Sequence, residues 1–157
     1  MKYICSLAKS IGISLLVGFV LITISEKLGS SYLSKFVSDS LLLLLIALTA
    51  INTATSSIVV TKLSDLLKAN PRIDFQSTIT SIKRSVVEQI AIIVIACALL
   101  VLKDGTYSSP GAAAILTYWA DMLLYATLSF SVLIVWDTAD GIFIILRHEN
   151  TANGGKP

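Results

Sequence analysis

The stretch Ser40–Thr61, SLLLLLIALTAINTATSSIVVT, decides the fold class of this chain. None of its residues carries a formal charge, and about 20 mostly apolar residues are enough for a helix to cross the hydrocarbon core of a bilayer. The composition agrees, because 55% of the 157 residues are hydrophobic and 14% are charged, whereas a soluble domain carries about 25% charged residues. The sequence therefore predicts a membrane protein.

Three further apolar stretches flank this segment. Together they predict an all-α fold, an integral membrane four-helix bundle with spans at about residues 4–25, 40–61, 82–102 and 113–137. The three prolines, Pro71, Pro110 and Pro157, all lie outside these spans. No span is therefore expected to have a proline kink.

The basic residues are distributed unevenly between the loops. Only Lys27, Lys35 and Lys103 fall in the first and third loops, and the other nine of the twelve lie in the N-terminus, the second loop and the C-terminal tail. Cytoplasmic segments of membrane proteins carry an excess of Lys and Arg. We therefore expect a multi-pass membrane protein with both termini in the cytoplasm.

Spans 2, 3 and 4 are expected to have helical extensions in the cytoplasm. Helical spacing continues after Thr61 and predicts a cytoplasmic hairpin over residues 62–88. This hairpin is either a docking arm for a soluble partner or an extension of the bundle that packs on itself. A helix over residues 112–146 would be about 52 Å long, against a hydrocarbon core of about 30 Å, and residues 147–157 are expected to form a flexible tail. The candidate partner-binding residues on this side are Lys68, Arg72, Lys83, Arg84, Phe143 and Ile144.

Polar residues within the second span share one face. Thr49, Asn52 and Ser56 follow three- and four-residue spacing, and such side chains hydrogen-bond between membrane helices. We predict that they stabilise helix contacts rather than line a permeation pathway. Small residues four apart in the first span also permit close helix contact; they are Ala8 with Gly12 and Ser14 with Gly18.

Two opposite charges are expected at the same depth in the membrane. By helix rise, Lys9 lies about 25 Å from Glu26, and Glu88 lies about 22 Å from Lys103. With Glu26 and Lys103 at the outer boundary, the depths of Lys9 and Glu88 agree to within about 3 Å. We predict an intramembrane ion pair between Lys9 and Glu88, with Arg84, one turn from Glu88, as the rival partner.

The chain carries no catalytic or cofactor-binding motif. His148 is the single histidine, and Cys5 and Cys97 form no CxxC pair. The glycine-rich nucleotide-binding spacings, the zinc-protease spacing and the nucleophile elbow are absent from the sequence. We therefore predict no enzymatic activity, no cofactor and no metal, and a net charge of +2 predicts no direct contact with nucleic acid.

Over its full length the chain resembles the membrane subunit of the Kiwa anti-phage defence system. Three segments carry the resemblance: SEKLGSSYLSKFVSD at residues 25–39, LLKANPRIDF at 66–75 and VLIVWDTADGIFIILRHEN at 132–150. The resemblance implies a homo-oligomeric sensor, a tetramer, that detects phage attachment or injection at the inner membrane. It also implies a soluble, DNA-binding partner protein held on the cytoplasmic face, with membrane lipid around the spans.

Two other functions stay open from the residues alone. The first is a stand-alone bacteriocin-immunity or superinfection-exclusion protein, which blocks a pore within the membrane and needs no soluble partner. The second is a small ion-coupled transporter. Small multidrug exporters also use a membrane glutamate, but they place it deep in the first helix, where this chain has none; Glu88 lies at the start of the third span.

Overall fold

The structure is a computed structural model that describes residues 2–69, 76–105 and 110–153. Over these residues it contains four helices and no strand, which confirms the predicted all-α fold. The helices are α1 (Lys2–Lys27), α2 (Tyr32–Ala69), α3 (Gln76–Lys103) and α4 (Pro110–Asn153). Each is long and apolar enough to cross a membrane, over Leu7–Lys27, Tyr32–Asp65, Thr78–Lys103 and Ala114–Asp140.

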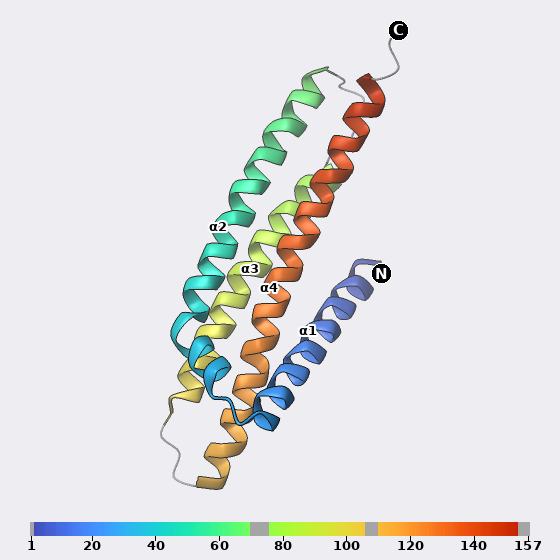
Figure 1. Ribbon diagram of the computed structural model, residues 1–157. Helices are drawn as coiled ribbons and strands as arrows, with labels where there is room; N and C mark the ends of the chain where they lie inside the picture. The colour runs from blue at the N-terminus through green and yellow to red at the C-terminus, as the bar shows by residue number, and fades with distance from the viewer. Residues whose placement is uncertain (1, 70–75, 106–109, 154–157) are drawn as a thin grey trace.

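Helix α4 is the central helix of the bundle (Figure 1). It packs against α1, α2 and α3, and α2 also packs against α3. Helix α1 packs mainly against α4 and lies on the other side of α4 from α2 in Figure 1. Helices α2, α3 and α4 thus pack on one another, and α1 packs along α4 with Ile22 buried in the same apolar core.

The interior and the outward faces of the bundle are both apolar. Leu41 of α2, Ala96 of α3 and Leu124 of α4 are fully buried in the core. Large apolar side chains also point outward, with Leu43 73% exposed and Val94 63% exposed. A soluble protein rarely exposes such an extensive apolar surface, so these outward faces suit contact with lipid.

One pair of small residues brings α1 close to α4. A Cβ atom added at Gly18 would lie 2.6 Å from the carbonyl oxygen of Met122, and Ser14, one turn away, is 2% exposed. The other predicted pair lies away from this contact, because Ala8 is exposed and a Cβ at Gly12 would meet no atom within 4 Å. The close approach of α1 therefore depends on Gly18.

The connection between α1 and α2 is shorter than predicted. Helix α2 begins at Tyr32, whereas the sequence predicts the second span from about residue 40. Gly29, with a φ of 59°, follows α1 in the left-handed conformation that glycine adopts without steric cost. Val37 is 1% exposed and packs in the same core as Leu41. The first turns of α2 are therefore part of the bundle, where Val37 is buried in the core.

At the opposite end, most of the predicted hairpin is helical. Helix α2 continues past Thr61 to Ala69, and α3 begins at Gln76. Residues 70–75 of the hairpin lie outside the described residues. At this end α2 and α4 both continue beyond the N-terminus of α1 (Figure 1).

The fourth helix is longer than predicted. It is continuous from Pro110 to Asn153, so residues 147–153 are helical although the sequence predicts a flexible tail there. Neither glycine nor proline occurs in residues 147–153. These are the two residues that most strongly disfavour a helix, so nothing in this segment stops the helix.

Candidate functional site

A hydrogen-bonded network joins α2, α3 and α4 toward the α2–α3 end of the bundle. The amide nitrogen of Asn52 donates to Gln89 Oε1 at 2.9 Å and to Ser85 Oγ at 3.0 Å. The hydroxyl oxygens of Ser85 and Thr138 lie 3.1 Å apart and share a hydrogen bond. Asn52 and Gln89 are each 1% exposed. These four residues, here called the Asn52 network, therefore connect the three core helices from inside the bundle.

The Asn52 network does not satisfy all of its polar atoms. Asn52 Oδ1, Gln89 Nε2 and the hydroxyl of the neighbouring Ser56 have no hydrogen-bond partner among the described residues. A buried polar group without a partner costs about 1–3 kcal/mol. Buried polar residues of this kind fix the register of packed helices at a cost in stability. The network therefore specifies how α2 and α3 align more than it stabilises them.

The three residues predicted to bond between helices have different roles in the structure. Asn52 bonds to α3. The hydroxyl of Thr49 instead donates to the carbonyl oxygen of Leu45 in its own helix at 2.8 Å. A threonine in a helix reaches the carbonyl one turn back without any partner helix. Ser56 is 5% exposed and lies inside the bundle, but its hydroxyl forms no bond among the described residues.

A second polar cluster ties the same three helices together at the opposite end. Lys103 Nζ lies 2.6 Å from Asp121 Oδ1 and donates to the hydroxyls of Ser34 at 2.9 Å and Ser38 at 2.8 Å. The hydroxyl of Ser34 also donates to Asp121 Oδ2 at 3.0 Å. The side chains of Lys103 and Asp121 are 15% and 12% exposed. These four residues are called the Lys103 cluster below.

The two polar groups lie at different levels of the bundle. Gln89 and Lys103 are separated by about 21 Å along the axis of α3. The fully buried apolar residues Leu41, Ala96 and Leu124 belong to the core of the same three helices. The Asn52 network and the Lys103 cluster therefore lie toward opposite ends of this apolar core.

A groove opens between α1, α3 and α4 toward the α2–α3 end. Its volume is about 490 Å³, and its charged residues are Arg84 and Glu88 of α3 and Asp137 of α4. Arg84 Nε donates to Glu88 Oε1 at 3.2 Å, with the two side chains 49% and 25% exposed. Ser85 lines the same groove and belongs to the Asn52 network. This site is called the Arg84 groove.

The predicted ion pair between Lys9 and Glu88 is replaced in the structure by one between Arg84 and Glu88. Glu88 forms its ion pair with Arg84, the rival partner, and the ion pairs of the described residues do not include one between Lys9 and Glu88. Lys9 is exposed on α1. Leu7 and Ser10, which flank Lys9 on α1, line one wall of the groove, and Glu88 lines the α3 wall. The groove therefore separates the two helices at this depth.

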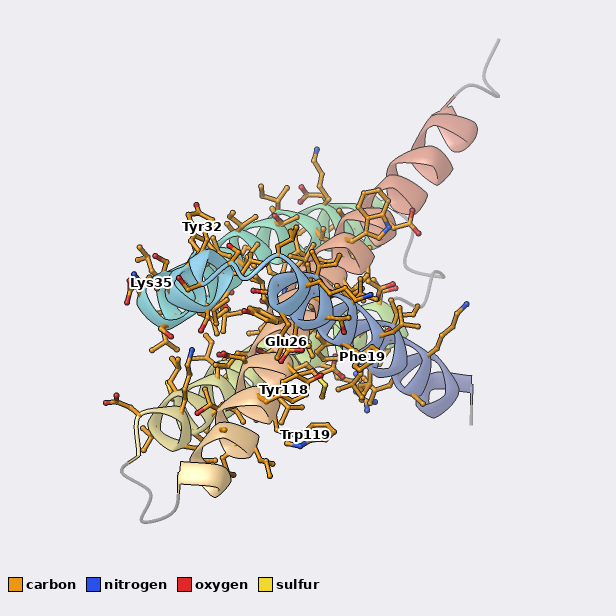
Figure 2. All side chains as sticks on the ribbon, turned by 60° about the horizontal axis from the view of Figure 1, so that its bottom comes forward. Phe19, Glu26, Tyr32, Lys35, Tyr118 and Trp119 are labelled. Atoms are coloured by element: carbon orange, nitrogen blue, oxygen red, sulfur yellow. The ribbon has the colours of Figure 1, made fainter. Side chains whose placement is uncertain are left out.

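A smaller hollow of about 390 Å³ lies at the end of the bundle where α1 meets α2. Glu26 of α1 and Tyr118 of α4 both line it and lie next to each other in Figure 2. Asp121 of the Lys103 cluster also lines this hollow. Trp119 points away from the helices in Figure 2 and is 53% exposed. An outward tryptophan near a helix end suits the interface between lipid and water.

The residues predicted to bind a partner do not form one cluster. Lys68 pairs with Asp65 at 3.6 Å on the surface of α2, with the side chains 77% and 61% exposed, and Lys83 is exposed on α3. Arg84 instead lines the Arg84 groove. The predicted residues that lie outside the described residues are Arg72 and the side chains of Phe143 and Ile144, whose backbone belongs to α4.

Several residues of these sites were not predicted from the sequence. Gln89 is four residues after Ser85, which places both on one face of α3, and this spacing is the signal that could have found them. Lys103 and Asp121 have opposite charges on either side of the third loop, but the sequence does not show how that loop directs α4 back along α3. No pattern in the sequence predicts the contact of Thr138 with Ser85.

Comparisons with protein-family models, with curated proteins and with solved structures give no significant match to this chain. The described residues also contain no group of three or more His, Cys, Asp and Glu side chains that could hold a metal ion. The features that bear on function are therefore the bundle, its two polar groups and its groove.

Proposed function

We propose that this chain is a protein of a bacterial inner membrane, with both termini in the cytoplasm, that serves as the sensor and anchor subunit of an anti-phage defence complex. It forms a homo-oligomer, a tetramer, and recruits a soluble DNA-binding effector to its cytoplasmic face. The chain itself contacts lipid and protein, and the effector contacts DNA.

The observation that carries this proposal is the shape of the α2–α3 end. Helices α2 and α4 continue past the N-terminus of α1 there (Figure 1). Helix α4 continues from Trp136, which this proposal places at the inner interface of the membrane, to Asn153, which is about 26 Å of helix. Lys68 and Lys83 are exposed at the same end. Helices that extend beyond a membrane give a soluble protein a surface on which to dock.

The charges support the orientation. Lys62, Lys68 and Lys83 are all exposed at the α2–α3 end, whereas Lys27 and Lys35 are exposed at the other. Counted over the whole chain, nine of the twelve basic residues belong to the segments placed in the cytoplasm. The α2–α3 end is therefore the cytoplasmic end in this proposal.

The resemblance to the Kiwa membrane subunit supports the anti-phage role. Its three segments, residues 25–39, 66–75 and 132–150, belong to both ends of the bundle. Residues 25–39 contain Ser34 and Ser38 of the Lys103 cluster, and residues 132–150 contain Thr138 of the Asn52 network. The resemblance thus includes residues that hold the helices together as well as the surfaces of the α2–α3 end.

The test is a comparison of phage plating on cells with and without the chain. Cells that express the chain together with its neighbouring genes should form fewer plaques than cells with an empty vector. Deletion of this chain alone, or of a neighbouring gene for a soluble DNA-binding protein alone, should restore plating. That soluble protein should also purify with the tagged chain in detergent, and the mass of the complex gives the number of copies.

Other outcomes would replace the proposal. Full protection by the chain alone indicates superinfection exclusion, and protection against the toxin of a neighbouring gene indicates bacteriocin immunity. Absence of any protection, together with solute flux in vesicles that depends on Glu88, indicates a transporter.

A further inference from the structure

We propose that the Arg84 groove binds the headgroup of a zwitterionic aminophospholipid, phosphatidylethanolamine, from the cytoplasmic leaflet. This inference rests on the membrane insertion and orientation of the proposed function, but not on the soluble partner. Three properties of the groove point to this ligand: its depth in the bundle, the charges on its walls and its apolar lining.

The depth of the groove matches the headgroup region. Arg84 and Lys103 are separated by about 28 Å along α3, and Trp119 and Trp136 by about 26 Å along α4. A hydrocarbon core is about 30 Å thick. With Lys103 and Trp119 at one interface, Arg84 and Trp136 reach the other. The charged part of the groove is then level with lipid headgroups.

The charges in the groove fit a headgroup that carries both signs. Arg84 provides a planar guanidinium with five donors, which can hold a carboxylate and a phosphate at once. Glu88 and Asp137 provide two carboxylates on the α3 and α4 walls, and these suit an ammonium group. The hydroxyl of Ser85 lies on the same wall as Arg84 and adds a donor for phosphate oxygen.

The same charges disfavour the other common lipids. One guanidinium and two carboxylates leave the lining with a net charge of −1, so a purely anionic headgroup such as that of phosphatidylglycerol would be repelled. The quaternary ammonium of phosphatidylcholine has no N–H group to donate to Glu88 or Asp137. Phosphatidylethanolamine has both a phosphate for Arg84 and a primary ammonium for the carboxylates.

The remaining walls suit the start of the acyl chains. Leu7 of α1 and Phe130, Leu133 and Trp136 of α4 line the groove, and Trp136 is 74% exposed. The volume of about 490 Å³ lies within the range of about 300–1,000 Å³ that is usual for small-molecule sites. The groove can therefore hold a headgroup together with the nearest part of its chains.

A lipid at this site would contact the network that aligns the core helices. Ser85 lines the groove and also bonds to Asn52 of α2 and Thr138 of α4. A phosphate that accepts a hydrogen bond from the Ser85 hydroxyl competes with Thr138 for its proton, whereas Asn52, which donates to Ser85 Oγ, keeps its bond. Binding in the groove is thus expected to change the thermal stability of the whole bundle and not only the position of α1.

The experiment is lipid binding to the purified full chain, measured by native mass spectrometry from detergent with equal amounts of phosphatidylethanolamine, phosphatidylcholine and phosphatidylglycerol. We expect phosphatidylethanolamine to be retained preferentially and to raise the melting temperature more than the other two. Loss of one charge-assisted hydrogen bond lowers affinity by about tenfold or more. Arg84→Gln and Asp137→Asn should each lower the apparent affinity for phosphatidylethanolamine by about that factor.

A second surface ion pair at this end of the bundle, Asp65 with Lys68, provides the matched control. Lys68→Gln and Asp65→Asn remove charges that lie on α2, away from the groove, and should leave the lipid preference unchanged. If Arg84→Gln does not fold, Asp137→Asn serves alone, because Asp137 is exposed and its replacement leaves the buried core intact.

Three results would overturn the proposal: equal retention of the three lipids, a preference for phosphatidylglycerol, or a preference that survives both groove variants. These results concern purified protein without any partner. A failure of phage defence or of partner recruitment would instead count against the proposed function and leave the lipid result standing.

Discussion

Lys103 at the end of α3 and Asp121 in α4 form an ion pair of 2.6 Å in which both side chains are largely buried, at 15% and 12% exposed. The ammonium group is also held by the hydroxyls of Ser34 and Ser38. Three helices therefore depend on one charged contact at the end of the bundle that carries the α3–α4 connection.

Removing one member of this pair should destabilise the protein more than removing both. Lys103→Met leaves the Asp121 carboxylate buried without its cation, which typically costs about 3–5 kcal/mol. The double variant Lys103→Met with Asp121→Leu should recover most of this loss. Unfolding midpoints in detergent measure the effect, with Lys35→Met, at an exposed lysine of the same end, as the control. Equal unfolding midpoints for Lys103→Met and for the control would show that the ion pair does not contribute to stability.

Gly18→Ala should loosen the contact between α1 and α4. The added Cβ would lie 2.6 Å from the carbonyl oxygen of Met122, so one of the two helices has to move. Overpacking of this kind typically costs about 1–3 kcal/mol. Gly12→Ala, where nothing lies within 4 Å, is the matched control and should be neutral or slightly stabilising. The measurement is again the unfolding midpoint, and two variants with the same midpoint would contradict the close approach.

Asn52 and Gln89 should be energetically coupled. Their hydrogen bond of 2.9 Å is buried between α2 and α3, and bonds of this kind between membrane helices are worth about 0.6 kcal/mol on average and up to about 1.7 kcal/mol. A double-mutant cycle of Asn52→Ala and Gln89→Ala should give a coupling in this range. A cycle of Thr49→Val with Gln89→Ala should give none, because Thr49 bonds to its own helix. Coupling of Gln89 with Thr49 but not with Asn52 would contradict the hydrogen bond between Asn52 and Gln89.

The two ends of the bundle should face different compartments. A cysteine-free background with either Ser64→Cys in α2 or Asp104→Cys after α3 places a thiol at each end, and both positions are exposed. In cells whose outer membrane has been permeabilised, a maleimide that cannot cross the inner membrane should modify position 104. The same reagent should leave position 64 unmodified until the cells are lysed. Modification of position 64 before lysis would reverse the orientation.

Reversal of basic charges at the α2–α3 end should abolish the proposed recruitment of a partner. In Lys68→Glu with Lys83→Glu, both side chains are exposed, so membrane insertion and oligomer size should stay unchanged while recovery of the soluble partner falls at least tenfold. Lys27→Glu with Lys35→Glu, also exposed but at the other end, is the control and should recruit normally. A loss of oligomeric state in the first variant would mean that the helical extensions pack on one another and do not dock a partner.

The sequence predicts the helices better than it predicts their contacts. Apolar length alone finds the four helices, since Ser40–Thr61 lies wholly within α2. The start of α2 at Tyr32 was missed because Lys35 and Asp39 are charged residues in a segment that reads as a loop. In the structure Val37 points into the core from between them, and only the packing shows this.

The polar contacts could be predicted only in part. The one-face spacing of Asn52 is visible in the sequence, but its partner Gln89 depends on how α2 and α3 are aligned. The predicted pair of Lys9 and Glu88 rests on depth alone, and depth says nothing about whether two helices are adjacent. Helices α1 and α3 have the Arg84 groove between them at that level, so the nearer Arg84 is the partner of Glu88.

The central position of α4 has a consequence for biosynthesis. Helix α1 leaves the ribosome first, but its main partner, α4, is the last of the four to be made. Until then α2 and α3 can pack against each other, while α1 lacks its principal contact. Assembly of the bundle is therefore a late event that waits for the final helix, and a nascent chain that stops before Pro110 leaves the α4-facing side of α1 at Gly18 uncovered.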